Sequence, residues 1–365
     1  MGITEKIAEI EAEMARTQKN KATEYHIGRL KARLSQLRSE LLENQSRSSA
    51  SSGPSFAVEK TGSVQLSLLG FPSVGKSSLL NLLTDTKSEV SPIDFCTLTA
   101  IPGNLYYNDV HMQLLDLPGI IEGASSGKGR GKEVLGVVRN SDCCIMMVDA
   151  DKAELEIELL TREVYACGIR LNEKPPDVQV RPLKTGGVKI VQAVPLTKLN
   201  TKQITSVLQE FKMHNCEVLF REDVTIDQLI DVISRNRVYM PCVYVFNKID
   251  QIVIEEVDRL AQMPHSVPIS CSFELNLDRL LTKIWEHLSI VRVYTKPKAD
   301  KPDFTEPVVL RKGGTVRHVC RSIHSTMEER FKYGVIWGAS AKHNAQRVGL
   351  DHVFADEDVC TIVAR

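Results

Sequence analysis

The sequence has no net charge and no paired cysteine motif. Its 365 residues include 46 Lys and Arg against 46 Asp and Glu, so a general attraction to nucleic acid or to a membrane surface is not expected. Nine cysteines are scattered without a C-x-x-C pair, and Cys143 and Cys144 lie in an apolar run that favours buried thiols. This usage is typical of a reducing compartment and argues against a disulfide-stapled scaffold.

Long apolar runs are missing as well. No stretch approaches the length of a membrane span. The first residues lack the apolar region of a secretory signal, and Lys6 stands where a myristoylation motif requires Ser or Thr. These absences together predict a cytoplasmic protein without a membrane partner.

The length predicts two to four domains. Two apolar stripes at helical spacing predict an N-terminal helical hairpin, and the Ser-rich stretch after it is typical of a flexible linker. Strands and helices then alternate, with one interruption of about 65 residues that is too long for a loop. The predicted order is a hairpin over 1–45, a linker over 46–61, one α/β domain in two parts over 62–171 and 239–290, an inserted α/β subdomain over 172–238, and a ubiquitin-like β-grasp module over 291–365.

The segment Gly70–Ser77 fits the pattern G-x-x-x-x-G-K-[ST] of a phosphate-binding loop. A buried-strand pattern at 64–69 leads into it and a helical pattern at 78–83 leads out. That order aims backbone N–H groups and the positive end of a helix at one point, as a polyphosphate requires. A structural glycine turn is the alternative, which the flanking patterns disfavour. The predicted nucleotide contacts are Gly70, Phe71, Pro72, Ser73, Val74, Gly75, Lys76, Ser77 and Ser78.

Five residues in and after this loop have the side-chain or backbone groups that phosphoryl transfer requires. Lys76 is placed to neutralise phosphate oxygens, and the Ser77 hydroxyl is placed to bind Mg²⁺. Thr97 is the candidate for a second hydroxyl ligand, and Asp116 suits the outer coordination sphere of Mg²⁺. The Gly119 N–H could donate to the γ-phosphate, although an isolated Asp-x-Pro-Gly can also be a plain turn. The predicted contacts of this segment are Asp116, Leu117, Pro118 and Gly119.

The segment Asn247-Lys248-Ile249-Asp250 indicates which nucleotide base the site accepts. A carboxylate at Asp250 accepts two hydrogen bonds from guanine N1–H and the 2-amino group, whereas adenine presents no such pair of donors. Downstream, Ser270, Cys271 and Ser272 offer backbone N–H groups to the guanine O6. The sequence therefore predicts GTP or GDP as the nucleotide, bound at the base by Asn247, Lys248, Asp250, Ser270, Cys271 and Ser272.

With these segments in place, the chain resembles the developmentally regulated GTP-binding (DRG) proteins. They belong to the Obg-like class of translation-factor-related GTPases. The resemblance spans nearly the whole chain and is carried by Thr17–Tyr25, Gly70–Ser77, Leu115–Gly123, Gly127–Gly131 and Arg237–Asp250. It implies an N-terminal helical hairpin, a GTPase domain with an inserted subdomain and a C-terminal TGS domain. It also implies association with ribosomes and a regulatory protein partner of the DFRP class.

Three positions depart from patterns common among related GTPases. Ile120 follows Gly119, where many GTPases place a Gln that orients the attacking water, so slow intrinsic turnover is expected. Ser73 replaces an Asn that holds an activating K⁺ ion in a related group, which leaves K⁺ activation open. Cys96 stands where the family pattern has a first Thr, and Thr97 keeps the role of ligand.

Basic side chains crowd the predicted hairpin, at Lys19, Lys21, Arg29, Lys31, Arg33 and Arg38. They form either a solvated helix face or a contact to RNA phosphate or an acidic partner. In the C-terminal module, Arg311, Lys312 and Arg317 are the candidates for RNA contact, and a protein-binding surface is the alternative.

Two functions follow. The first is a slow GTPase switch. The second is a nucleotide-gated adaptor for RNA or the ribosome, in which hydrolysis is incidental. An ATPase is disfavoured because the guanine-recognition segment is intact.

Overall fold

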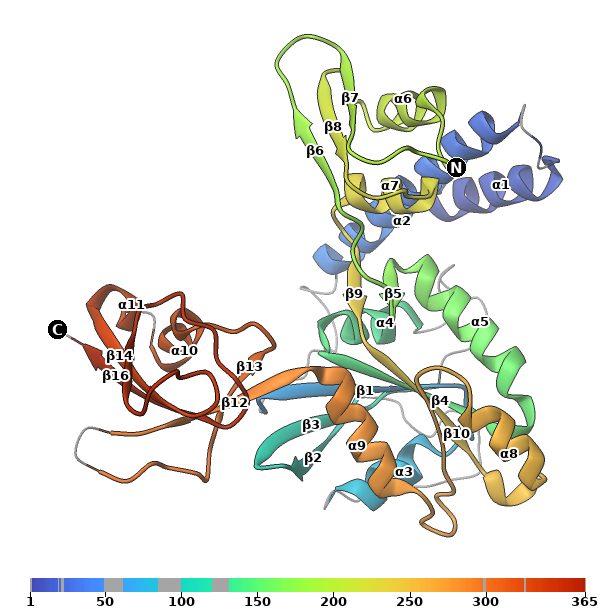
Figure 1. Cartoon of the computed structure of the whole chain (residues 1–365). Coiled ribbons are helices and arrows are strands. Elements are labelled where there is room, and N and C mark those ends of the chain that lie inside the picture. The colour runs from blue at the N-terminus through green and yellow to red at the C-terminus, as the bar shows by residue number, and fades with distance from the viewer. Residues whose placement is uncertain are drawn as a thin grey trace. The chain divides into compact units, whose positions relative to one another are not determined.

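The computed structural model describes residues 2–18, 20, 23–48, 62–84, 100–119, 131–297, 300–324 and 326–364, without the side chains of 42–48 and 131–133. The chain divides into two compact units (Figure 1). One comprises residues 1–55, 121–135 and 159–240, and the other comprises 56–120, 136–158 and 241–365. Each unit is described by itself below.

The second unit contains a six-stranded sheet in the order β11-β10-β4-β1-β3-β2. Five strands are parallel, and β2 pairs with β3 in the antiparallel direction across the turn at Asn108 and Asp109. Both turn residues have positive φ, which Asn and Asp tolerate. The strands are β1 (Val64–Leu69), β2 (Ile101–Tyr107), β3 (Val110–Asp116), β4 (Cys143–Asp149), β10 (Cys242–Asn247) and β11 (Ser266–Pro268).

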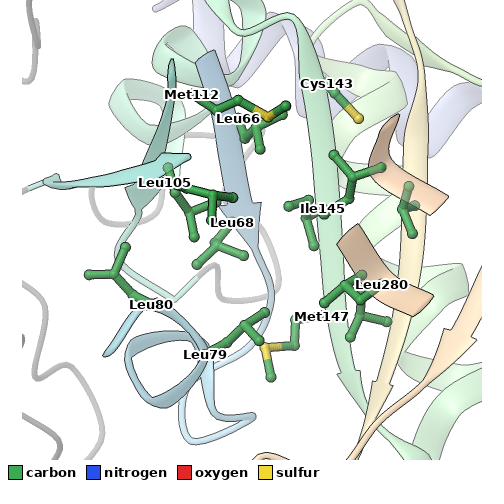
Figure 2. Close-up of a cluster of buried hydrophobic side chains, with 14 of the residues drawn as sticks. Leu66, Leu68, Leu79, Leu80, Leu105, Met112, Cys143, Ile145, Met147 and Leu280 are labelled. Atoms are coloured by element: carbon green, nitrogen blue, oxygen red, sulfur yellow. The ribbon is translucent and has the colours of Figure 1, made fainter. Parts of the chain in front are cut away.

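Apolar side chains from the strands and from two helices form the core of this sheet. Figure 2 shows Leu66 and Leu68 of β1 gathered with Ile145 and Met147 of β4 and with Leu79 of α3. Both faces of β1 are buried, as expected for a central parallel strand. The helical segments in or partly in this unit are α3 (Lys76–Leu83), α4 (Gly131–Asn140), η2 (Ala150–Lys152), α5 (Ala153–Ala166), η3 (Ile249–Gln251), α8 (Ile254–Ala261) and α9 (Leu277–Leu288).

The C-terminal part of the same unit is a five-stranded sheet in the order β13-β12-β16-β14-β15. Helix α10 packs on one face of it, through Val316, Val319 and Cys320. Two helices lie between β13 and β14, because the first ends at Ile323, before the extended His324, and the second starts after Thr326. The elements are β12 (Ile290–Thr295), β13 (Val308–Arg311), α10 (Val316–Ile323), α11 (Met327–Arg330), β14 (Phe331–Trp337), β15 (Gln346–Val348) and β16 (Asp358–Ala364).

The first unit combines the N-terminal hairpin with the region that the sequence predicted as an insertion. A three-stranded sheet, β6-β8-β7, packs with α6 and α7, and a second small sheet pairs β5 with β9. None of the helices in the described part of the chain has both the length and the apolar composition of a membrane span. The elements are α1 (Ile3–Arg16), α2 (Glu24–Ser48), β5 (Ile169–Leu171), β6 (Val178–Pro182), β7 (Val188–Gln192), α6 (Thr201–Glu210), β8 (Cys216–Phe220), α7 (Ile226–Ser234) and β9 (Val238–Met240).

Helix α2 docks on α6 and α7, so the hairpin shares a core with the inserted subdomain. Ala32 is fully buried in that core. The helix also uses much of its positive charge there, because Arg29 pairs with Glu210 at 3.3 Å and Lys31 pairs with Asp227 at 2.6 Å. These pairs favour the view that this face of α2 is an internal contact. The remaining basic positions of the hairpin include Lys19 and Lys21, which lie outside the described residues.

Replacing Ala32 with Glu should release this docking. A carboxylate placed in a fully buried apolar site costs about 3 kcal/mol or more unless the helix moves away. We expect a lower thermal midpoint and faster proteolysis within 1–48, with GDP affinity unchanged. Arg33→Glu, at the exposed neighbouring position, is the matched control. Identical unfolding and proteolysis of the two variants would contradict the docking of α2.

Candidate functional site

The phosphate-binding segment connects β1 to α3 at the carboxyl edge of the sheet. Gly75 precedes the helix with φ 101°, and Ser73 also has positive φ, at 62°. A Cβ atom on Gly70 would lie 2.2 Å from the backbone oxygen of Met147 in β4. The pattern therefore needs Gly75 for its backbone angle and Gly70 for close approach to the neighbouring strand.

The Lys76 side chain lies back over this loop. Its ammonium donates to the backbone oxygens of Phe71 at 2.7 Å and Gly70 at 3.2 Å. Burial lowers the pKa of Lys76 to about 8, against the opposing effect of the negative charges of Asp116 and Glu156. A buried cation beside this loop is an arrangement that a phosphate group complements.

This pKa predicts how nucleotide affinity depends on pH. Phosphate favours the charged ammonium, which the free protein already carries below about pH 8. Above that value binding must take up a proton, so the affinity for GDP should fall by up to about tenfold per pH unit. Calorimetry between pH 7.5 and 9 in buffers of different ionisation enthalpy counts the protons. Lys76→Met is the control, because this variant lacks the ammonium while the guanine base of GDP titrates as before. Equal proton uptake by the two proteins would refute the assignment of the proton to Lys76.

Ser77 and Asp116 meet beside the loop. The Ser77 hydroxyl donates to Asp116 Oδ2 at 2.5 Å, and Asp116 is fully buried at the end of β3. Parallel pairing of Leu68 with Asp116 brings the ends of the two strands together. A hydroxyl and a carboxylate are oxygen donors, which Mg²⁺ prefers, so these residues fit that ion.

Gly119 lies against the same loop, because a Cβ atom on it would be 2.8 Å from the backbone nitrogen of Pro72. Its segment therefore runs directly past Pro72 of the loop, and the role of the Gly119 N–H stays a prediction. Thr97, Ile120 and most of the Gly-rich stretch 122–131 lie outside the described residues. Their predicted roles stay predictions.

Asn247 connects the phosphate loop to the segment at Cys271 that is predicted to contact the base. Its side-chain amide donates to the Val74 backbone oxygen at 2.8 Å and accepts from the Cys271 N–H at 3.1 Å. A Cβ atom on Gly75 would lie 2.4 Å from the same amide nitrogen. One buried side chain thus holds three segments that are far apart in the sequence.

The carboxylate of Asp250 is positioned by a neighbour. The Ser270 hydroxyl donates to Asp250 Oδ1 at 2.6 Å and accepts from the Phe273 N–H at 3.3 Å. Burial and the charge of Asp250 raise the pKa of Cys271 to about 12, so its thiol stays protonated. The sequence assigned the N–H groups of this loop to the guanine O6, and the structure shows that the Cys271 N–H is bonded to Asn247.

Asp149 is a site residue that the sequence reasoning missed. It ends β4, directly opposite Asn247 in the sheet register, and its carboxylate pairs with the Lys248 ammonium at 2.6 Å. Lys248 itself has a left-handed backbone with φ 65°. The available signal was the position of Asp149 right after the buried run 143–148, at the edge where the other strand ends meet.

Three family models match successive parts of the chain. The model described as 50S ribosome-binding GTPase matches residues 65–181, and the C-terminal region of the MMR_HSR1 domain matches 185–290. The TGS domain model matches 291–364. Together with the structure they confirm the predicted fold class, a mixed α/β chain with a P-loop GTPase domain and a C-terminal TGS domain.

Curated relatives are similar over the whole length. Developmentally-regulated GTP-binding protein 2 of Bos taurus is 54% identical over 365 residues, which is 100% of both chains. Developmentally-regulated G-protein 2 of Arabidopsis thaliana is 52% identical over 100% of this chain and 92% of its own. Among solved structures, Era in complex with MgGDPNP and a 16S ribosomal RNA segment is 20% identical with a TM-score of 0.36, covering 61% of this chain and 56% of its own. Since the full-length identity exceeds half of all positions and the phosphate and guanine segments are intact, the chain belongs to the developmentally regulated GTP-binding protein family.

Proposed function

We propose that this protein is a slow GTPase that hydrolyses GTP to GDP and phosphate with Mg²⁺ and acts with ribosomes in the cytoplasm. The observation that carries the proposal is the bridging of Val74 and Cys271 by Asn247. Because one side chain joins the phosphate loop to the base loop, the two ends of a guanine nucleotide have a single preassembled receptor.

Each residue then has a defined task. Lys76 holds phosphate oxygens, Ser77 and Thr97 would bind Mg²⁺, and Asp116 holds the Ser77 hydroxyl in place. Mg²⁺, when bound, supplies charge that offsets the negative charge of the phosphates. The Gly119 N–H is placed to sense the γ-phosphate. Ile120 offers no hydrogen bond to the attacking water, which is why slow turnover is expected in the absence of a partner.

Steady-state turnover of the purified protein tests this function. We expect slow release of phosphate from GTP that Lys76→Ala abolishes, and ATP should not compete with GTP. Comparison of K⁺ with Na⁺ decides whether the Ser73 hydroxyl supports K⁺ activation, and addition of ribosomes decides whether they stimulate the reaction. Absence of GTP cleavage in every one of these conditions would rule out the enzyme.

A second function, a nucleotide-gated adaptor for RNA or ribosomes, has support from the TGS domain. On β14, Ile336 faces the core, so Tyr333 and Trp337 lie on the face away from α10. There Arg347 lies 4.7 Å from the Tyr333 ring and Lys296 lies 4.7 Å from the Trp337 ring. Cations beside aromatic rings suit RNA phosphate and bases.

Two of the three TGS residues first proposed for RNA contact are engaged within the protein. Arg311 pairs with Asp142 at 3.2 Å, and Arg317 pairs with Glu328 and with Asp351. We therefore propose Arg347 and Lys296 as better positions to mutate, alongside Lys312. A DFRP-class partner is proposed from the family resemblance alone.

Sedimentation with ribosomes separates the two functions. An adaptor gated by nucleotide should bind ribosomes more strongly with a non-hydrolysable GTP analogue than with GDP, and Lys76→Ala should lose that difference. If binding is equal with GTP analogue, GDP and no nucleotide, the gating is refuted. Arg347→Ala tests the TGS face in the same assay.

A further inference from the structure

The first unit contains a cavity of about 310 Å³ that the nucleotide site does not use. It is lined by residues of the hairpin helices α1 and α2, of the end of α5, of β5 and of α7. Its apolar wall includes Met14, Leu34 and Ile230. A volume of this size is in the range that accommodates a small organic ligand.

The inner wall of the cavity is a buried cluster of two arginines around one carboxylate. Arg170 donates to both oxygens of Asp231 at 2.7 and 2.8 Å, and Arg237 donates to one of them at 2.8 Å. The exposed fractions are 3% for Arg170, 5% for Asp231 and 8% for the Arg237 side chain. Both arginines are permanently charged, so the cluster carries one positive charge in excess.

The other charged residues of the wall do not compensate for this excess. Lys31 pairs with Asp227 at 2.6 Å, and Arg38 pairs with Glu11 at 2.7 Å, so each of these pairs is neutral. Burial raises the pKa of Tyr165 to about 12, so this lining residue supplies no negative charge. Four basic residues thus face three acidic ones in the lining.

The two arginines differ in how well they are satisfied. Arg170 lies 3.3 Å from the Tyr165 ring and donates to the backbone oxygens of Tyr165 and Ile169, whose dipoles offset part of its charge. Arg237 donates to Asp231 and to the neutral Ser35 hydroxyl at 2.6 Å. The uncompensated charge therefore belongs mainly to Arg237.

We propose that this cavity binds a small molecule with an oxyanion group, a phosphate or a carboxylate, held by Arg237 with its apolar body against Leu34 and Met14. A buried excess charge is costly, and an anion in the adjoining cavity offsets that cost. The cavity shares no residue with the nucleotide site, and all of its lining residues belong to the first unit.

The test is a calorimetric titration of the full chain, holding one equivalent of GDP with Mg²⁺, with inorganic phosphate and separately with acetate at constant ionic strength. We expect one saturable site for at least one of the two anions. Arg237→Met should weaken it at least about tenfold, since a charge-assisted hydrogen bond is lost, and Arg237→Lys should retain it in part. Preference for phosphate or for acetate identifies the class of oxyanion.

A second pair of variants keeps the test valid if Arg237→Met fails to fold. Leu34→Glu places a carboxylate in the cavity and should abolish anion binding, whereas Leu34→Gln, of the same size and without charge, should retain it. Lys76→Ala should leave the binding unchanged, which separates this site from the phosphate loop. No saturable binding of either anion to the wild-type protein, or equal binding by Leu34→Glu and Leu34→Gln, would overturn the proposal.

Discussion

Asp250→Asn is expected to lower the affinity for GDP about 10³-fold and to create affinity for xanthosine diphosphate (XDP). The carboxylate, held by the Ser270 hydroxyl at 2.6 Å, is the proposed acceptor for guanine N1–H and the 2-amino group. An Asn amide accepts from N1–H without the help of a negative charge, and its own NH₂ faces the 2-amino group, so one charge-assisted hydrogen bond is weakened and the other is lost. Xanthine has a carbonyl oxygen in place of that amine, and the Asn NH₂ can donate to it.

Direct titration of GDP and XDP into both proteins measures this exchange. Asp258→Asn is the matched control, because Asp258 is an exposed residue of α8 and should show wild-type affinity for GDP. Unchanged GDP affinity in Asp250→Asn, or a loss for GDP with no gain for XDP, would contradict the proposed contact to the base.

Gly70→Ala is expected to have the largest effect on the phosphate loop. The added Cβ would lie 2.2 Å from the Met147 backbone oxygen and 3.1 Å from a Val74 methyl group. Since the first neighbour is backbone within the sheet, the loop rather than β4 must shift. The Gly70 oxygen that Lys76 contacts moves with it. We expect a loss of at least about 10²-fold in GDP affinity and about 2–4 kcal/mol in stability.

Gly136→Ala is the control for that substitution. Among the described residues, no atom beyond the two chain neighbours and the helix's own backbone lies within 4 Å of a Cβ built on Gly136, which is in the middle of α4. Alanine should therefore raise stability by about 0.5–1 kcal/mol through helix propensity, without changing GDP affinity. Thermal denaturation and GDP titration of the two variants give the comparison, and a Gly70→Ala protein with wild-type affinity would refute the steric argument.

Much of the nucleotide site could be read from local patterns. The phosphate loop, the Asp116 segment and the Asn247 segment each follow a buried strand, and parallel strands bring their carboxyl ends to one edge of a sheet. Chain order alone therefore indicated that these residues meet. The contacts among them needed the three-dimensional register. Asp149 approaches Lys248 because β4 and β10 are neighbours in the sheet, and no local pattern states which strands are neighbours.

The N-terminal hairpin shows even more clearly that local sequence patterns do not state which elements are neighbours. Its helical stripes and its basic residues were visible in the sequence, and they left open whether the basic side chains face solvent or contact RNA phosphate or an acidic partner. The structure places Glu210 and Asp227, on helices more than 170 residues later in the chain, beside Arg29 and Lys31. Ion pairs between such distant residues depend on how whole helices pack, because no local pattern in the sequence indicates which residues will be paired.

The sequence by itself indicated the family, a guanine nucleotide and the alternation of helices and strands. Those follow from residue types at short spacing, where backbone sterics and hydrogen-bond chemistry act locally. Only the tertiary structure decided that Asn247 joins phosphate loop to base loop, that α2 is buried against α6 and α7, and that Arg170 and Arg237 share the single carboxylate of Asp231. Those outcomes depend on packing between segments that are distant in the sequence. This packing decides which charged side chains are buried together and which of them lack a compensating charge.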